Sequence, residues 1–143
     1  MCLLDEVIDW DARRIRCRTA THRAPDNPLR AHNRLGIACG VEYAAQAMAL
    51  HGALAGGAAG FTGAADSAGA DVGGTSQVGL LASVRDVRFG VLRLDDIKSD
   101  LICEATHLAG NDLTALYDFA LREGDRSLLS GRASVVLNAG VKI

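Results

Sequence analysis

The stretch from Ile37 to Leu54 constrains the fold of this chain more than any other segment. Its apolar residues recur at helical spacing and leave almost no polar face, which predicts one long helix. Such a helix must be covered by other structure on nearly all sides, because a helix on a surface shows a polar stripe. The one acid inside this pattern is Glu42, with Gln46 one turn later. A buried acid is costly unless it is paired, neutralised or used in chemistry, so Glu42 is the first candidate for a catalytic residue.

Strand-like runs lie on both sides of this helix. Two short runs precede it, at 3–10 and 13–22, and the second alternates apolar residues with arginines, as a strand with one solvated face does. Four more runs follow, at 78–89, 100–109, 113–123 and 127–138. Compact connections at 109–112 and 123–126 predict an antiparallel meander for the last three. The order of elements predicts an α+β fold in which a curved antiparallel sheet wraps around one buried helix.

The 143 residues have the length of one domain, so 1–143 is predicted to be a single domain. Residues 22–34 contain both prolines and are predicted to form a loop. Residues 56–76 are rich in Gly and Ala, which predicts a flexible loop. A phosphate-binding glycine loop is the alternative there, but no Lys-Ser or Lys-Thr pair follows and the GxGxxG spacing is absent.

Charge and cysteine content argue against several classes of function. The net charge of −2 and the pI near 6.0 lack the basic footprint of a nucleic-acid-binding protein. The apolar stretches are shorter than the ~20 residues of a membrane span, and no secretory signal opens the chain, which predicts a cytoplasmic protein. The cysteines lack the spacing of metal ligands, so free buried thiols are predicted rather than a metal site or disulfides. They are Cys2, Cys17, Cys39 and Cys103.

Several motifs add to this layout. They are MCLLDEVIDWD at 1–11, DNPLR at 26–30, GVEYAAQAMALHGAL at 40–54, VGLLASVRDVRF at 78–89 and SGRASVVL at 130–137. With the predicted order of elements, they resemble the hot-dog fold and, within it, the 3-hydroxyacyl-(acyl carrier protein) dehydratases. In particular, the chain is similar to the small ApeP-like dehydratases linked to aryl polyene biosynthesis.

The resemblance implies an active site made by a His in the loop before the helix and by an acid on the helix of the partner subunit. Glu42 matches the acid, because it precedes Tyr43 to Gln46 as the acid does in the E-A-x-A-Q run of FabZ-like proteins. Two residues are candidates for the His. His32 ends a run similar to P-F-F-x-G-H, and His22 lies beside the DNPLR motif.

The implied reaction is dehydration of a 3-hydroxyacyl thioester, which needs a base for the C2 proton and an acid for the departing hydroxyl. A neutral His can take the proton, and a carboxyl held in an apolar site can stay protonated and donate. Gly36 and Gly40 would let the substrate approach the backbone, and helix N–H groups near Gly40 would polarise the thioester carbonyl. Gln46 would bind the Glu42 carboxyl or line the acyl tunnel, or else satisfy a backbone group. Neither step requires a metal or a redox cofactor, so no cofactor is expected.

The implied partner is an acyl carrier protein bearing a 3-hydroxyacyl chain, in fatty acid or polyene-type biosynthesis. A sheet around one helix leaves uncovered edges, which predicts a homodimer or a heterodimer of two hot-dog chains with acid and base on different chains. Two other functions stay open: hydrolysis of acyl thioesters, and a non-catalytic acyl-binding subunit of a heterodimer. Of the other histidines, His51 is predicted to pack in the core and His107 to lie on a strand surface.

Overall fold

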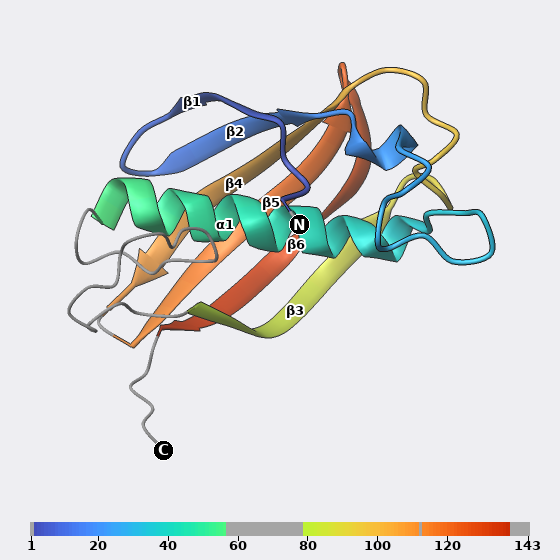
Figure 1. Cartoon of the computed structure of the whole chain (residues 1–143). Coiled ribbons are helices and arrows are strands. Elements are labelled where there is room, and N and C mark those ends of the chain that lie inside the picture. Colours follow the sequence, from blue (N-terminus) through green and yellow to red (C-terminus); the bar gives the residue numbers. More distant parts are fainter. Residues whose placement is uncertain (1, 57–78, 112, 138–143) are drawn as a thin grey trace.

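The computed structural model describes residues 2–56, 79–111 and 113–137. Six antiparallel strands form one sheet in the order β1-β2-β4-β5-β6-β3, and one long helix, α1 (Gly40–Gly56), lies across one face (Figure 1). The strands are β1 (Glu6–Trp10), β2 (Arg14–Thr19), β3 (Gly79–Phe89), β4 (Leu101–Gly110), β5 (Thr114–Glu123) and β6 (Arg126–Leu137). This confirms the predicted α+β fold with a curved sheet and one helix. Residues 57–76 of the predicted flexible loop lie outside the described residues.

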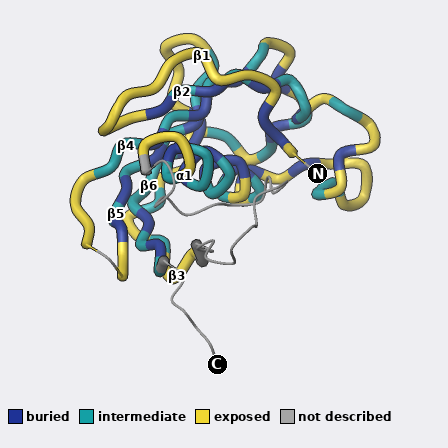
Figure 2. Tube along the Cα trace, turned by 60° about the vertical axis from the view of Figure 1, so that its left-hand side comes forward, coloured by how far each residue is buried: buried dark blue, intermediate teal, exposed yellow. Residues whose placement is uncertain are grey.

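Alternation along the strands builds the core between the sheet and α1. The inward side chains are apolar and mostly fully buried, whereas the next residue along each strand faces the opposite side. Figure 2 shows buried segments of β2 and β5 around α1, with exposed residues at β1 and the loop tips. The inward set includes Ile15, Cys17, Leu101, Cys103, Ala105, Tyr117, Phe119, Leu121 and Leu129. Cys17 and Cys103 are free and buried as predicted, but Cys2 is exposed and Cys39 half-buried.

The outer face of the sheet carries the arginines and acids of the alternating strands. Their ion pairs include Arg16–Asp9 at 2.6 Å, Arg18–Glu6 at 2.8 Å and Arg132–Asp118 at 2.8 Å. These side chains are about one-third to one-half exposed, so water and salt screen the pairs and each adds little to the stability of the fold. On this solvated face, acids of β1 thus neutralise Arg16 and Arg18 of β2, and an acid of β5 neutralises Arg132 of β6.

Most of α1 is covered, as the predicted fold requires, but the described residues leave a gap at Glu42, which is the one exposed residue between Gly40 and Gly52. Tyr43, Ala44 and Met48 are buried on its sheet side, whereas Glu42, on the opposite side, is exposed. The reason is geometric: α1 packs on β2, β4 and β5, and the described sheet reaches only one side of it (Figure 1). The half-buried Ala45 and Ala49 flank Glu42 on the outer side. A helix side of small apolar residues favours contact with further protein.

Candidate functional site

Glu42 lies in the first turn of α1, where the helix dipole favours a negative charge. Its carboxylate makes no hydrogen bond or ion pair with any residue that the structure describes. Glu42 is exposed, so the residues that the structure describes do not form the predicted apolar enclosure around it. Glu42 can still serve as an acid if a second chain covers this side of the helix.

Gly40, at the start of α1, is buried against the sheet. A Cβ at this position would lie 2.6 Å from Cδ2 of Leu129 and 2.9 Å from Cδ2 of Leu121, and both leucines are themselves buried. Only glycine allows the helix to approach the sheet this closely. The structure thus gives Gly40 a packing role; a contact with substrate stays a prediction.

Gln46 fixes the N-terminal segment. Its side-chain oxygen accepts a hydrogen bond from the backbone N–H of Leu3 at 2.7 Å. Of the alternatives left open by the sequence, satisfying a backbone group is the one observed. A role in the acyl tunnel stays a prediction.

His22 lies in the short 3-10 helix η1 (Thr21–Arg23), and its side chain is fully buried. Nε2 is 3.0 Å from the carbonyl oxygen of Ile97. Because a carbonyl only accepts, Nε2 carries the proton of the neutral ring and Nδ1 carries the lone pair. This Nδ1 is buried and has no hydrogen-bond partner in the described part of the chain. Burial lowers the pKa of His22, which keeps the imidazole neutral and basic at Nδ1.

His22 and His107 together predict an acid-sensitive stability. Burial is the main cause that lowers the pKa of each ring below its ordinary value of 6.5. Above about pH 6.5 both rings are neutral in the folded and unfolded chain; below it the unfolded chain binds protons first, so unfolding becomes easier as pH falls. Urea unfolding at a series of pH values should show the free energy of unfolding decrease between about pH 6.5 and 5, before most carboxylates titrate.

The substitutions His22→Gln and His107→Gln should each flatten that slope. A wild-type stability that is constant across this interval would contradict the prediction.

His32 occupies the tip of a two-residue β-hairpin. Ala31 and Arg34 exchange two backbone hydrogen bonds, of 2.8 and 2.9 Å, and the residues between them, His32 and Asn33, have φ of 53° and 67°. Two left-handed residues in succession define a type I′ turn. His32 is exposed and has no contact with Glu42 among the described residues. Among the described residues, neither candidate His forms a hydrogen bond or an ion pair with Glu42.

The segment entering α1 is held by an aspartate that the sequence analysis did not single out. Oδ1 of Asp95 accepts from the N–H of Leu35 at 3.0 Å, and Arg93 binds both carboxylate oxygens of Asp95. The Arg93 guanidinium holds the pKa of this carboxyl far below its usual range. Gly36 bridges to Arg93 in the same place, and a Cβ on Gly36 would meet nothing within 4 Å. Gly36 is thus open to approach from outside, as substrate binding requires, but a contact with substrate stays a prediction.

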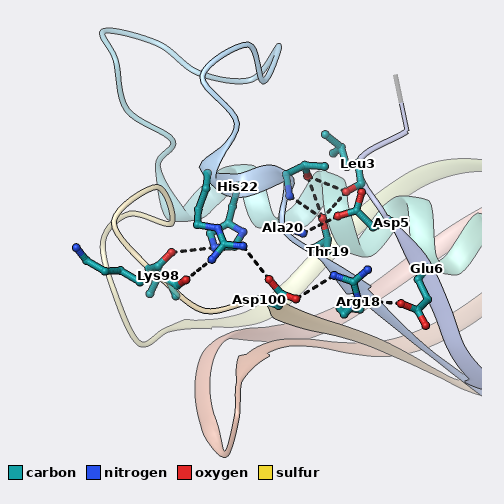
Figure 3. A network of polar contacts seen from close by, with 12 residues as sticks. Leu3, Asp5, Glu6, Arg18, Thr19, Ala20, His22, Lys98 and Asp100 are labelled. Carbon is teal, nitrogen blue, oxygen red and sulfur yellow. Dashed lines mark hydrogen bonds and ion pairs between the residues drawn. The ribbon is translucent and has the colours of Figure 1, made fainter.

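A buried polar network joins the DNPLR motif to α1. The Tyr43 hydroxyl lies 2.9 Å from Oγ1 of Thr21 and 3.0 Å from Nδ2 of Asn27. Thr19 and Thr21 both donate to the carbonyl of Leu3, at 2.5 and 2.7 Å (Figure 3). The loop that carries His22 is therefore fixed to the helix that carries Glu42. The Asn of DNPLR was the available signal, since a short amide in a proline loop commonly bonds nearby backbone.

Tyr43→Phe should destabilise the fold by about 1–3 kcal/mol, because it keeps the buried ring but removes the hydroxyl that Thr21 and Asn27 share. Chemical denaturation measures the change. A double-mutant cycle with Thr21→Val tests the contact itself: the two losses should be less than additive. Full additivity would show that the hydroxyl does not couple the loop to the helix.

Ion pairs surround His22 on its outer side. Asp100 accepts from Arg18 at 2.9 Å and from Arg23 at 2.8 Å, and Arg23 also donates to the carbonyl of Lys98 (Figure 3). The Lys98 side chain extends away from this group (Figure 3). These pairs tie β2 to the loop that supplies the Ile97 carbonyl, and so they help to hold His22 in its orientation.

Two further histidines, His51 and His107, lie near the C-terminal half of α1. His51 is buried, with Nδ1 2.8 Å from the Tyr117 hydroxyl and Nε2 2.9 Å from the carbonyl of Asp11. The ring of His107 meets that of Tyr117 edge to face at 5.3 Å between centroids. The packed role predicted for His51 is confirmed, and His107 is half-buried on β4. Both rings have structural partners.

Among the described residues, no group of three or more His, Cys, Asp or Glu side chains is arranged to hold a metal ion. The described helices include none long and apolar enough to cross a membrane.

Comparison with known proteins identifies the family. A family model described as ApeP dehydratase, ApeP-like, matches residues 1–141. The chain belongs to the ApeP-like dehydratase family. No curated protein sequence matches it.

Solved structures show that members of this family share the hot-dog fold with other enzymes. The dehydratase heterocomplex ApeI:P from Xenorhabdus doucetiae matches with a TM-score of 0.73 at 18% identity, over 94% of this chain and 81% of that one. A mutant thioesterase from Pseudomonas aeruginosa matches with a TM-score of 0.60 at 11% identity, over 92% and 79%. A thioesterase from Haemophilus influenzae gives 0.60 at 10% identity, over 92% and 76%. At these identities the likeness establishes the fold, and the chain has the predicted hot-dog architecture.

Proposed function

We propose that this ApeP-like chain contributes Glu42 to a dehydratase site completed by a second hot-dog chain, acting on 3-hydroxyacyl groups carried by an acyl carrier protein. The observation that carries the proposal is the state of Glu42. It is the single acid of the long helix, it is exposed on a side of small residues, and it has no partner among the described residues. A second chain laid on this side would exclude water from the carboxyl and favour its protonated form.

The second chain has an edge to pair with. Strand β3 is the last of the described strands on one side of the sheet, and no other described strand pairs with the outer edge of its eleven residues. A long uncovered edge strand favours pairing with another chain. A partner whose β3 continued the sheet would bring two outer helix sides together, as a two-fold arrangement requires.

In this mechanism, His22 is the base and Glu42 the acid. Nδ1 of His22 takes the C2 proton of the thioester, and the resulting enolate-like charge is stabilised by backbone N–H groups at the start of α1. The Glu42 carboxyl donates its proton to the 3-hydroxyl, which leaves as water, and the product is a 2,3-unsaturated thioester. Burial of His22 and its bond to Ile97 supply the neutral tautomer that this step needs. The buried Nδ1 of His22 has no hydrogen-bond partner among the described residues, which costs stability unless the atom has a function. This favours His22 over His32 as the base.

The experiment is to incubate the purified protein with a 3-hydroxyacyl carrier-protein thioester and to follow the acyl group by mass. Loss of one water supports dehydration. Release of a free acid would instead support thioester hydrolysis, the reaction of the thioesterases that share the fold. His22→Gln should stop water loss, whereas His32→Gln should not; the opposite result would move the base to His32.

A second candidate function is that of a non-catalytic subunit that binds acyl chains in a heterodimer. It is favoured by one observation: among the described residues, no histidine forms a hydrogen bond or an ion pair with Glu42. To test this role, the protein is assayed alone and then with a co-expressed hot-dog partner. The non-catalytic role holds if the protein is inactive alone, if the partner restores activity, and if that activity survives Glu42→Gln in this chain. Activity that depends on Glu42 supports the dehydratase role.

A further inference from the structure

The turn of residues 94–97 joins the two segments that the proposed mechanism uses. It is closed by a hydrogen bond from the N–H of Ile97 to the carbonyl of Leu94 at 3.0 Å. The carbonyl of Ile97 accepts from Nε2 of His22 at 3.0 Å, and the N–H of Leu94 donates to the carbonyl of Leu35 at 2.7 Å. Leu35 is buried and belongs to the segment that leads into α1. The turn therefore links the candidate base to the entry of the helix that carries the candidate acid.

The side chain of Asp95 holds this turn against that segment. It is only 7% exposed, and its Oδ1 accepts from the N–H of Leu35 at 3.0 Å and from Nε of Arg93 at 2.9 Å. Its Oδ2 accepts from the other end of the same guanidinium. Two parallel bonds from a planar guanidinium fix the direction of a carboxylate as well as its position. Asp95 therefore connects the turn rigidly to the entry of α1.

Asp96, the next residue of the turn, has no such part in the structure. Its side chain is 62% exposed, and its Oδ2 lies 3.9 Å from Nε of Arg93. It binds no backbone N–H among the described residues. Loss of this acid removes one screened surface charge, whereas loss of the Asp95 carboxylate leaves the N–H of Leu35 without that acceptor. The two neighbouring acids thus differ in packing but not in charge, which makes Asp96 a matched control.

We propose that Asp95 is a positioning residue of the site: through the turn it keeps the Ile97 carbonyl on His22 and fixes that imidazole relative to the entry of α1. The hydrogen bond that one ring nitrogen makes decides which nitrogen carries the proton, so a fixed carbonyl at Nε2 leaves Nδ1 as the base. Asp95 forms no hydrogen bond or ion pair with His22 or Glu42 among the described residues, so it acts through the backbone. The effect on His22 is a property of the folded chain, and only the effect on turnover rests on the proposed function.

Nuclear magnetic resonance of isotope-labelled histidine rings tests the effect on His22, with His22→Gln to assign the signals. The wild type should show one tautomer, with its proton on Nε2, and a pKa below the ordinary value of 6.5 because the ring is buried. Asp95→Ala releases the turn, so the second tautomer should appear and the pKa should rise as water reaches the ring. Asp95→Asn keeps an acceptor for the N–H of Leu35, so it should change His22 in the same direction but less, and it decides the test if Asp95→Ala does not fold.

Asp96→Ala removes the same charge from the same turn and should leave the tautomer and the titration of His22 unchanged. The charged groups beside His22 are Arg23 and Asp100, and all of these variants keep them. A wild-type tautomer and titration in both Asp95 variants would overturn the proposal. An equal change in Asp96→Ala would also overturn it, because the cause would then be charge rather than position.

Turnover measures the consequence for catalysis. With a 3-hydroxyacyl thioester, Asp95→Ala should lower kcat about 10- to 100-fold and leave KM nearly unchanged, because the base is displaced while the acyl-binding surface stays. Unchanged kcat would overturn the positioning role. A wild type that releases no water would overturn the proposed function, whereas an altered His22 ring in the Asp95 variants would still show that Asp95 positions this imidazole.

Discussion

Glu42→Gln is expected to lower the rate of dehydration by about two to four orders of magnitude, the contribution of a positioned acid. The amide has nearly the shape of the carboxyl but has no proton that it can give to the departing hydroxyl. The measurement is single-turnover loss of water from a carrier-bound 3-hydroxyacyl thioester, followed by mass spectrometry, in whichever homomeric or heteromeric assembly is active.

The fold should tolerate this change, which makes the result interpretable. Glu42 is exposed and without a partner among the described residues, so the substitution should lose only its favourable interaction with the helix dipole and change the free energy of unfolding by less than about 1 kcal/mol. Asp125→Asn, at an exposed acid in the β5–β6 turn, is the matched control and should retain full activity. Retained activity in Glu42→Gln would remove this residue from the mechanism.

Gly90→Ala is expected to destabilise the protein by about 2–3 kcal/mol, although Gly90 is exposed. A Cβ there would lie 2.4 Å from the carbonyl oxygen of Ser127, and this oxygen belongs to backbone that cannot rotate away. The change would also strain the hydrogen bond from Gly90 N–H to Leu128 O, now 2.8 Å. The loop that follows holds both the entry to α1 and the imidazole of His22, so activity should fall with stability.

Gly36→Ala is the matched control for this prediction. Gly36 has φ of −69°, which alanine adopts readily, and its Cβ would meet open space. Urea unfolding should show no loss of stability there. A change in KM in this variant would then report directly on contact between substrate and Gly36. If Gly90→Ala proves as stable as the wild type, the loop does not depend on close packing against β6.

Local patterns in the sequence were sufficient for the elements and their order. The alternation around Ile15 and Cys17 reports a strand with one buried side, because side chains on a strand point to opposite faces in turn. The turn at Gly124, with φ of 59°, needed a residue tolerant of the left-handed region, and the sequence supplied glycine. The family motifs likewise lie within continuous stretches of chain.

The environment of the candidate site could not be read in the same way. The apolar helix pattern suggested a buried Glu42, but Ala45 and Ala49 are compatible with burial by the same chain or by another. The sequence also does not distinguish the two candidates for the base, His22 and His32. Their difference arises from residues far along the chain: the carbonyl of Ile97 fixes His22 in the interior, whereas His32 closes an exposed turn.

The strands, the long helix and the family could be predicted from continuous stretches of sequence, because each depends on neighbours a few residues apart. Three features became visible in the folded chain: Gly40 serves close packing, Gln46 binds the Leu3 backbone, and Glu42 is exposed among the described residues. These outcomes depend on which distant segments meet α1. Contacts between distant segments depend on how the whole chain folds around the sheet, so a local sequence pattern does not predict them.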